Sequence, residues 1–316
     1  MPEKDPNKIT CSARCISENP GSSFLKNTLE LNLIKRFIQG QDILDVGIGT
    51  ARTLRPLLEM GLRVTGVNSS QKMLQEAQRQ ASSCVISLKQ GDITQLPCTS
   101  NAFDSAIALN VLRDVPNWRE VLRHWKNSVR CGGKIIFNMH SQDHVIAAYG
   151  KNKVTWPKAL ATTVPPDQAH DNSRLTLAEL HQFANEAEMT ITAVIPYFAF
   201  CGANRLIDKH IGHKNRWLRM LSWFSRDENL FLLGLFLEEQ LLAHLTPRMS
   251  DHLFIVLTNQ PNKEANAHFV QRIADIDTAL KQHSFSGLLP YLPLSLEAYR
   301  TNLSQFLQPL RARGFF

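Results

Sequence analysis

The stretch Asp42-Ile-Leu-Asp45-Val-Gly47-Ile-Gly49-Thr50-Ala51 is an apolar run that leads into an acidic residue and a glycine-rich bend. Glycines at positions 47 and 49 allow backbone torsions and a close approach that a Cβ atom would block. The amides of a helix that begins near Thr50 can face a polar ligand. The stretch therefore predicts a strand, a turn and a helix around a pocket for an adenosine-containing ligand.

Two features separate this bend from the fingerprint of dinucleotide-binding proteins. The carboxylate of Asp45 precedes the first glycine by two residues, where it suits a cationic ligand group better than a pyrophosphate. The fingerprint also needs Gly or Ala three residues after its second glycine, and that position is Arg52 here. The sequence therefore argues against a nicotinamide cofactor.

Short β-rich runs alternate with helical patterns after residue 41, and such alternation predicts a parallel sheet with right-handed crossovers. A capping box at Thr176-Leu-Ala-Glu179 opens a later helix. The β-rich runs are 42–46, 63–67, 84–89, 104–109, 134–139 and 190–195, the run 252–258 is a candidate for a seventh, antiparallel strand, and the helical patterns are 24–38, 50–60, 70–81, 116–130, 230–245, 265–280 and 295–310.

Several segments between residues 41 and 139 together resemble class I S-adenosylmethionine-dependent methyltransferases. The resemblance implies a Rossmann-like, doubly wound α/β fold whose seven-stranded sheet is parallel except for one antiparallel strand. It also implies S-adenosylmethionine as the cofactor. The segments are Asp45-Val-Gly47-Ile-Gly49, Arg63 to Leu74, Gly91-Asp92-Ile93, Phe103 to Asn110, and Cys131-Gly132-Gly133 with the strand that follows.

The resemblance assigns roles to individual residues of the cofactor site. The acid and glycine backbone of the first motif hold the methionine part of the cofactor, and Asn110 lies at a strand end under the reactive methyl group. Asn68 stands where the family normally has Asp or Glu on the ribose hydroxyls, and its amide can accept one hydrogen bond and donate another. The predicted cofactor-binding residues are Asp45, Gly47, Gly49, Asn68, Ser69, Met73, Asp92, Ile93 and Asn110.

Methyl transfer requires alignment of the acceptor and exclusion of water, and a base is needed only when the acceptor must lose a proton. His140 is the first candidate for that base because it directly follows the fifth strand. His144 and Tyr149 are the next candidates. No metal site is predicted, and the six cysteines show no pattern of a disulfide scaffold or zinc ribbon.

The chain of 316 residues is predicted to have three parts. Residues 1–40 form an N-terminal lid helix, residues 41–260 form the methyltransferase core, and residues 261–316 form a helical appendage that packs on the core or forms a dimer interface. Substrate-pocket insertions are expected at 140–175 and 199–250, since ligands of open α/β sheets bind outside the carboxyl ends of the strands.

The composition, with 43% hydrophobic residues, indicates a globular enzyme, and no apolar run is long enough to span a bilayer. A cytoplasmic location is therefore expected. The net charge of +7 includes a basic, aromatic-rich stretch between Arg205 and Arg226. This stretch leaves nucleic-acid binding open as a less favoured option, because no RNA-binding module is present.

The function predicted from the sequence is transfer of a methyl group to a small, secondary-metabolite type acceptor in biosynthesis. One alternative keeps the cofactor but breaks a different carbon–sulfur bond, by aminocarboxypropyl transfer or by ring closure with release of methylthioadenosine. Another is an RNA-binding or RNA-modifying protein. Asn68 in the ribose-binding position and the lack of an obvious catalytic base leave the first alternative open.

Overall fold

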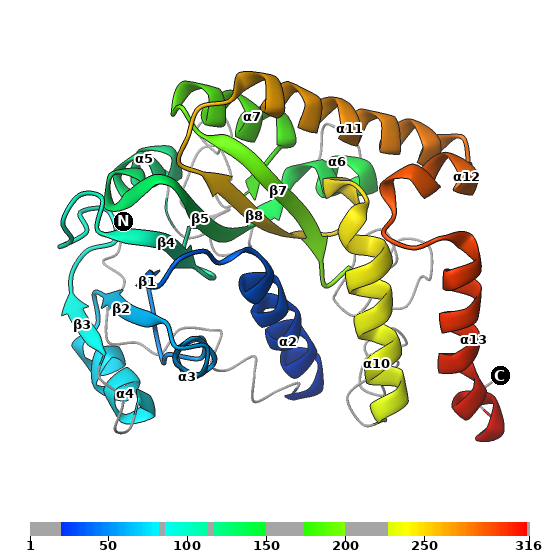
Figure 1. The fold of residues 1–316 in the computed structure, drawn as a ribbon, viewed down its shortest axis with the longest axis horizontal. Helices are drawn as coiled ribbons and strands as arrows, with labels where there is room; N and C mark the ends of the chain where they lie inside the picture. The colour runs from blue at the N-terminus through cyan, green and yellow to red at the C-terminus, as the bar shows by residue number, and fades with distance from the viewer. Residues whose placement is uncertain are drawn as a thin grey trace.

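The computed structural model describes residues 20–81, 86–112, 115, 117–149, 174–199 and 227–314. Within these residues the chain forms one sheet in the order β3-β2-β1-β4-β5-β8-β7, with a short strand β6 beside β5 (Figure 1). The strands are β1 (Asp42–Val46), β2 (Arg63–Asn68), β3 (Ser87–Gln90), β4 (Phe103–Ala108), β5 (Val129–Ser141), β6 (Arg174–Leu175), β7 (Thr190–Tyr197) and β8 (His252–Thr258).

The direction of the strands confirms the predicted fold class. Strand β8 runs antiparallel to both of its neighbours, β5 and β7, whereas the pairs from β3 to β5 along the sheet are parallel. The strand β6 adds a two-residue pairing that the sequence did not indicate. The chain order reverses between β1 and β4, which is where open α/β sheets form their ligand crevice.

Helices cover both faces of the sheet because successive strand residues point to opposite faces. Ile135 and Phe137 pack with helices α5 (Trp118–Ser128) and α7 (Leu177–Glu186). Ile136 packs on the other face. That face is covered by α2 (Pro20–Phe37), α3 (Leu54–Glu59), α4 (Gln71–Ala81) and α10 (Glu228–Phe236).

Several element boundaries differ from the predicted ones. Helix α3 begins at Leu54 rather than near Thr50, because Gly47, Gly49 and Ala51 all have positive φ angles and the chain forms a loop there. Strand β5 has 13 residues and begins directly after α5. The predicted helix 230–245 changes after Phe236 into π-helical and 3₁₀ turns. Residues 82–85 and Pro116 lie outside the described residues.

In the described part of the chain, three α-helices follow β8: α11 (Lys263–Lys281), α12 (Phe285–Leu288) and α13 (Leu296–Ala312). Ile273 and Ile276 of α11 form a small cluster with Leu288 of α12. Helix α13 packs beside α10 (Figure 1), and Leu310 joins the core on the α2 face. These contacts confirm the predicted helical character of the region, while its assignment as a separate unit stays a prediction.

Short helix α6 (Gln142–Tyr149) follows β5 directly and begins the predicted insertion at 140–175. The insertion's residues 150–173 and the basic stretch around Arg205 to Arg226 lie outside the described residues. Among the residues that the structure does describe, no helix combines the length and the apolarity that a membrane crossing requires.

Candidate active site

The loop after β1 has the geometry of a ligand cradle. Gly47 has φ 70°, and a Cβ atom there would lie 2.5 Å from Cγ2 of Val111. The amides of Gly47 and Ile48 both donate to the carbonyl oxygen of Val67 in the neighbouring strand, at 2.8 and 3.1 Å. The loop is therefore anchored to β2 and needs glycine at its first bend.

Asp45 lies buried at the carboxyl end of β1, with 4% of its surface exposed. The hydroxyl of Thr53 donates to its Oδ2 at 2.6 Å. Burial raises the pKa of Asp45 to about 7, although the hydrogen bond from Thr53 and the charge of Arg52 oppose the rise. A cationic ligand group beside this carboxyl would favour its ionised form.

The end of β2 presents Asn68 in a turn that opens α4. Its Oδ1 accepts from the amide of Ser70 at 2.9 Å, and the hydroxyl of Ser70 accepts from the amide of Met73 at 3.3 Å. Ser69 is exposed, and its carbonyl accepts from the Gln90 side chain. Part of the accepting capacity of Asn68 is thus used to shape the turn.

The turn after β3 is tied to its neighbours on both sides. The amide of Gly91 donates to the carbonyl of Asn68 at 3.1 Å, and the indole of Trp125 donates to the carbonyl of Ile93 at 2.7 Å. Asp92 is exposed, and its Oδ1 accepts from the Thr94 amide at 2.8 Å. Asp45, Asn68 and Asp92 therefore lie at the carboxyl ends of three neighbouring parallel strands or just after them, an arrangement that fits an extended adenosine ligand.

The strand-end residue Asn110 has φ 60°, a left-handed conformation that is uncommon outside glycine. Its amide donates to Oδ1 of Asn138 at 2.6 Å, and the amide nitrogen of Asn138 reaches Oδ1 of Asn110 at 3.3 Å. The two asparagines link the ends of β4 and β5. Their pairing holds the backbone of Asn110 at the mouth of the sheet.

A buried polar network continues from Asn138 to the N-terminal helix. The side-chain amide of Asn138 donates to the hydroxyl of Tyr197 at 2.9 Å, and that hydroxyl donates to Oε1 of Glu30 at 2.6 Å. Arg52 of the glycine loop donates to Oε2 of Glu30 at 2.5 Å. Burial opposes ionisation of Glu30, but the charges of Arg52 and Lys26 and the hydrogen bonds from Tyr197 and Arg52 together outweigh it, so the pKa of Glu30 is lowered.

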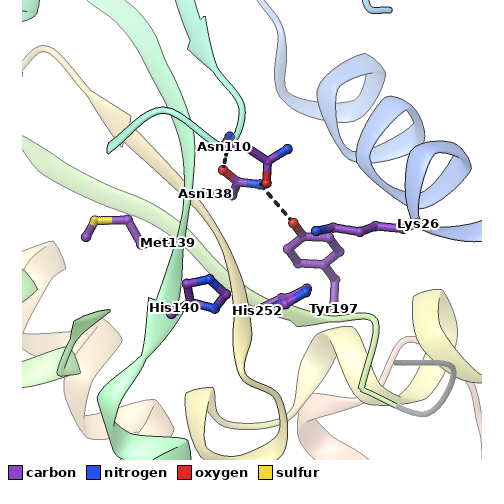
Figure 2. A pocket seen from close by; sticks show the side chains of 7 residues that line it. All are labelled: Lys26, Asn110, Asn138, Met139, His140, Tyr197 and His252. Atoms are coloured by element: carbon purple, nitrogen blue, oxygen red, sulfur yellow. Dashed lines mark hydrogen bonds between the residues drawn. The ribbon is translucent and has the colours of Figure 1, made fainter. Parts of the chain in front are cut away.

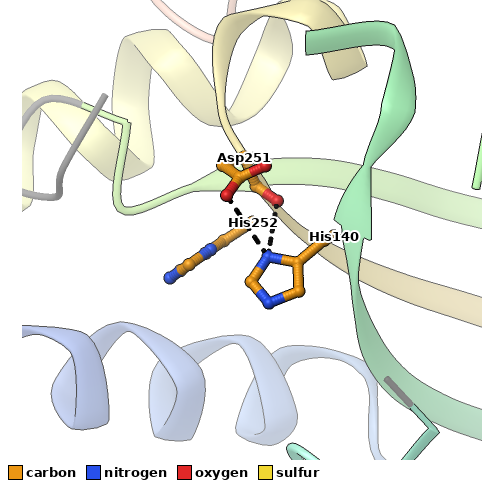
Figure 3. A group of neighbouring side chains, drawn as sticks. All are labelled: His140, Asp251 and His252. Atoms are coloured by element: carbon orange, nitrogen blue, oxygen red, sulfur yellow. Dashed lines mark hydrogen bonds and ion pairs between the residues drawn. The ribbon is translucent and has the colours of Figure 1, made fainter. Parts of the chain in front are cut away.

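His140 is held by Asp251, the residue that precedes β8 (Figure 3). Its Nδ1 lies 3.3 Å from the carbonyl oxygen of Asp251 and 3.4 Å from Oδ2 of the same residue. Arg174 donates to both carboxylate oxygens of Asp251. Burial opposes ionisation here too, but the hydrogen bonds from His140 and Arg174 hold the pKa of Asp251 far below its usual value.

These contacts decide the roles of the two imidazole nitrogens. Because both oxygens near Nδ1 are acceptors, Nδ1 of His140 carries a hydrogen, and in the neutral form of the ring Nε2 is then the acceptor. Metal-binding atoms of His140, Asp251 and His252 also lie within 4.8 Å of one another. The carboxylate of Asp251, however, is already occupied by Arg174 and His140, so the geometry favours a hydrogen-bonded dyad over a metal site.

A small pocket opens between α2 and the ends of four strands (Figure 2). It brings together two of the predicted residues, Asn110 and His140. The described residues that line it are Lys26 from α2, Asn110 after β4, Asn138, Met139 and His140 of β5, Tyr197 of β7 and His252 of β8.

The other two base candidates, His144 and Tyr149, both belong to α6. His144 is fully buried in α6, where its Nδ1 lies 2.7 Å from the carbonyl oxygen of Arg248, and it does not line the pocket. Tyr149 belongs to the last turn of α6, and its side chain lies outside the described residues. His140 is therefore the candidate that the structure places at the mouth of the sheet.

The comparisons with known proteins agree with the geometry of the glycine loop. Residues 44–137 match the family model described as a methyltransferase domain. This part of the chain is a class I S-adenosylmethionine-dependent methyltransferase domain. The match spans β1 to β5 and includes every predicted cofactor-binding residue, so S-adenosylmethionine is the cofactor of the family to which this domain belongs.

Relatives of the methyltransferase domain show moderate identity over part of their length. The demethylmenaquinone methyltransferase of Renibacterium salmoninarum is 31% identical over 99 residues, which are 31% of this chain and 41% of that protein. The ubiquinone biosynthesis O-methyltransferase of Chromobacterium violaceum is 27% identical over 176 residues, 51% of this chain and 70% of that one. The chain thus matches about two fifths of the first relative's length.

Among solved structures, an S-adenosylmethionine-dependent methyltransferase from Mesorhizobium loti is similar to this chain. The TM-score is 0.45 with 18% sequence identity, over 75% of this chain and 97% of that one.

Proposed function

We propose that this chain transfers the methyl group of S-adenosylmethionine to a small-molecule acceptor bound in the pocket beside His140. The observation that carries the proposal is the junction at the sheet edge, where β1 with its glycine loop lies beside β4, and Asn110 after β4 lines the pocket together with His140. The cofactor supplies a methyl group already activated by a positively charged sulfur. The protein's own task is then to orient the acceptor and exclude water.

His140 is proposed as the general base for this transfer. Asp251 orients its imidazole through Nδ1, so the lone pair on Nε2 is available for a proton of the acceptor. The acceptor oxygen would form the bond to the methyl carbon while the carbon–sulfur bond breaks and its electron pair stays on sulfur. The proton of the acceptor hydroxyl would pass to Nε2 of His140.

The names of the relatives support a small-molecule acceptor. One is named for demethylmenaquinone and another is named an O-methyltransferase of ubiquinone biosynthesis. On the second name, the class we propose is a hydroxylated acceptor of biosynthetic or secondary-metabolite type. A cytoplasmic location and a homodimer remain predictions. So does contact of the basic stretch between Arg205 and Arg226 with RNA, since that stretch lies outside the described residues.

An assay with methyl-labelled S-adenosylmethionine and a panel of phenols and catechols tests the proposal. We expect S-adenosylhomocysteine and a labelled acceptor to appear together, separated by chromatography. Release of methylthioadenosine would show that a different carbon–sulfur bond breaks and would contradict methyl transfer. Absence of any affinity for S-adenosylhomocysteine in calorimetry would remove the basis of the proposal altogether.

A further inference from the structure

We infer that Arg174, the first residue of β6, is a positioning residue for the methyl transfer and holds the carboxylate of Asp251 against Nδ1 of His140. This inference rests on the proposed function, because it concerns the base of the same reaction. It gives a role to a strand of two residues that the sequence did not indicate.

Arg174 contacts both carboxylate oxygens of Asp251, because its Nη1 donates to Oδ1 and its Nη2 donates to Oδ2 at 3.3 Å. The same Nη1 also donates to the carbonyl oxygen of Ser141, the residue after His140, at 3.2 Å. A planar guanidinium that makes two such hydrogen bonds fixes the plane of a carboxylate, which a single contact does not. Oδ2 of Asp251 is also the oxygen that lies 3.4 Å from Nδ1 of His140. Arg174 therefore sets the direction in which the Asp251 carboxylate faces the imidazole.

The backbone of Arg174 is anchored on both sides. In the parallel pairing of β6 with β5, Arg174 lies opposite His140 and Leu175 lies opposite Ser141. Leu175 is buried in the core. The next residue, Thr176, is the N-cap of α7 and forms its capping box. Burial and the helix cap thus hold a short strand in register beside the end of β5.

The pair of Arg174 and Asp251 lies largely out of water, with 8% and 14% of the two side chains exposed. Burying two charges costs free energy, and apolar side chains of similar size often stabilise a protein equally well. Orientation of His140 explains the pair better than stability does. Neither Arg174 nor Asp251 is among the described residues that line the pocket, so Arg174 acts through Asp251 and His140.

The guanidinium also affects the charge that His140 experiences. Burial opposes ionisation of Asp251, but the hydrogen bonds from His140 and Arg174 hold the pKa of this carboxyl far below its usual value. Asp251 is therefore negatively charged at neutral pH, and Arg174 offsets that charge. Without Arg174, the carboxylate would stabilise the protonated imidazole more strongly, and less of His140 would be in the neutral form that accepts a proton.

Other ionisable groups also lie close to His140. The ring of His252 is 5.1 Å away between centroids, and burial lowers its pKa well below the usual value. Burial raises the pKa of Tyr197, which lines the same pocket, well above its usual value. Lys26 of α2 also lines the pocket and pairs with Glu30, with Nζ 4.0 Å from Oε1. A change in the titration of His140 in an Arg174 variant would therefore report on the pair of Arg174 and Asp251.

The test observes the ring of His140 directly, by NMR of protein that contains ¹⁵N-labelled histidine and is saturated with S-adenosylhomocysteine. The signal of His140 is the one that His140→Gln removes. Arg174→Lys keeps the charge but loses the planar guanidinium, and Arg174→Met loses both. Arg130→Met is the matched control, because Arg130 also binds carboxylates, those of Asp42 and Asp104, but at the opposite end of β5.

In the wild type and in Arg130→Met, we expect the neutral ring of His140 to carry its hydrogen on Nδ1. Both Arg174 variants should show a mixture of rings with the hydrogen on Nδ1 and on Nε2, because Asp251 is no longer held in one direction. In Arg174→Met the midpoint of the His140 titration should also move to higher pH by about half a unit or more, whereas Arg174→Lys should leave it in place.

Kinetics with the acceptor found among the phenols and catechols gives a second measure. At saturating S-adenosylmethionine, kcat should fall about tenfold in Arg174→Lys and further in Arg174→Met. The KM for the acceptor and the affinity for S-adenosylhomocysteine should stay within about twofold, since Arg174 is not among the described residues of the pocket lining.

A His140 ring that keeps its hydrogen on Nδ1 in Arg174→Met would overturn the inference, as would a wild type with the hydrogen on Nε2. An equal loss of kcat in Arg130→Met would overturn it too, because the effect would then be a general loss of stability. Should Arg174→Met fail to fold, the position of the hydrogen in Arg174→Lys decides the matter. A wild type without affinity for S-adenosylhomocysteine would contradict the proposed function instead, and spectra of the ligand-free variants would still test how His140 is held.

Discussion

The backbone defines one half of the sheet's carboxyl edge, and side chains define the other half. On the β1 to β3 side, the site is formed by a short loop in which Gly47, Gly49 and Ala51 adopt positive φ angles, so backbone torsions define its shape. On the β4 to β7 side, side chains from α2 and four strands define the pocket. The first half depends on local geometry and the second on contacts between distant parts of the chain.

One pair of residues connects these halves. Arg52 belongs to the glycine loop, and its partner Glu30 belongs to α2, the helix whose Lys26 lines the pocket. The glycine loop and α2 are therefore joined by an ion pair whose carboxylate is buried. We therefore expect a change in the loop to affect cofactor binding first, and a change in the network to affect both the stability of the fold and acceptor binding.

The largest effect is expected from His140→Gln. Loss of a general base lowers the rate of the chemical step by about 10² to 10⁴-fold. The affinity for S-adenosylhomocysteine should stay within about twofold, because His140 lies outside the glycine loop. Steady-state kinetics with a hydroxylated acceptor, together with calorimetry, measures both quantities. Asp251→Asn should give a smaller loss of kcat, and an unchanged kcat in His140→Gln would contradict the assignment.

The next effect concerns the network that joins the halves. Glu30→Ala removes one member of a buried ion pair and leaves the guanidinium of Arg52 without its carboxylate, which should lower the free energy of unfolding by about 3 to 5 kcal/mol. Urea denaturation measures the change. The control Glu59→Ala breaks the exposed pair of Glu59 with Arg55 and should change the stability little. Equal losses in the two variants would show that the network has no special role.

A smaller loss is expected from Gly47→Ala, which tests the cofactor half by itself. The new Cβ atom would lie 2.5 Å from Val111, on a backbone with φ 70°. Crowding of this kind costs about 1 to 3 kcal/mol, and the displaced loop should also weaken binding of S-adenosylhomocysteine. Gly132→Ala is a matched control, because Gly132 has φ 79° but nothing within 4 Å of the added atom. Equal losses of stability and of S-adenosylhomocysteine affinity in both variants would show that the backbone torsion causes the loss and that contact with Val111 does not.

The smallest effect is a dependence of cofactor affinity on pH through Asp45. The pKa of about 7 in the protein without cofactor is above the usual value, so the folded protein holds this proton until the pH rises through 7. A cationic cofactor group favours the carboxylate, and affinity should therefore fall by up to about tenfold for each pH unit below 7. Calorimetry between pH 5.5 and 8.5 tests this, and Asp45→Asn should remove the dependence.

The same shift predicts the sign of a stability effect. Because the folded state binds the Asp45 proton more tightly than the unfolded chain does, the contribution of this residue to the free energy of unfolding falls as the pH rises from about 4 to 7. Thermal unfolding of the wild type and of Asp45→Asn separates this contribution from that of other groups. A wild type that becomes more stable relative to Asp45→Asn over this interval would contradict the raised pKa.

The cofactor half could be predicted from sequence because its information is local. Asp45 and the glycines that follow are contiguous, and their spacing is sufficient to indicate the turn. The predicted start of the following helix, near Thr50, was wrong by four residues, because the helix begins at Leu54. The positive φ of Ala51 extends the loop beyond the two glycines. His140 could be proposed because it directly follows a predicted strand.

The acceptor half could be predicted only in part because its partners are far apart in the chain. Tyr197 and Glu30 are 167 residues apart, and His140 and Asp251 are 111 apart. No local sequence pattern indicates that such distant residues are in contact. A weak signal did exist, since Tyr197 and Asp251 both flank predicted strands, and strand ends on one side of an α/β sheet meet at one edge.

The antiparallel course of β8 has a consequence for how this protein can acquire new acceptors. Since β8 runs antiparallel to its neighbours, its first residue, His252, lies at the edge of the sheet that holds the pocket, and so does Asp251 just before it. Residues between β7 and β8 can thus lengthen or change while the loop after β1 stays untouched. Evolution can in this way alter what is methylated without disturbing the donor.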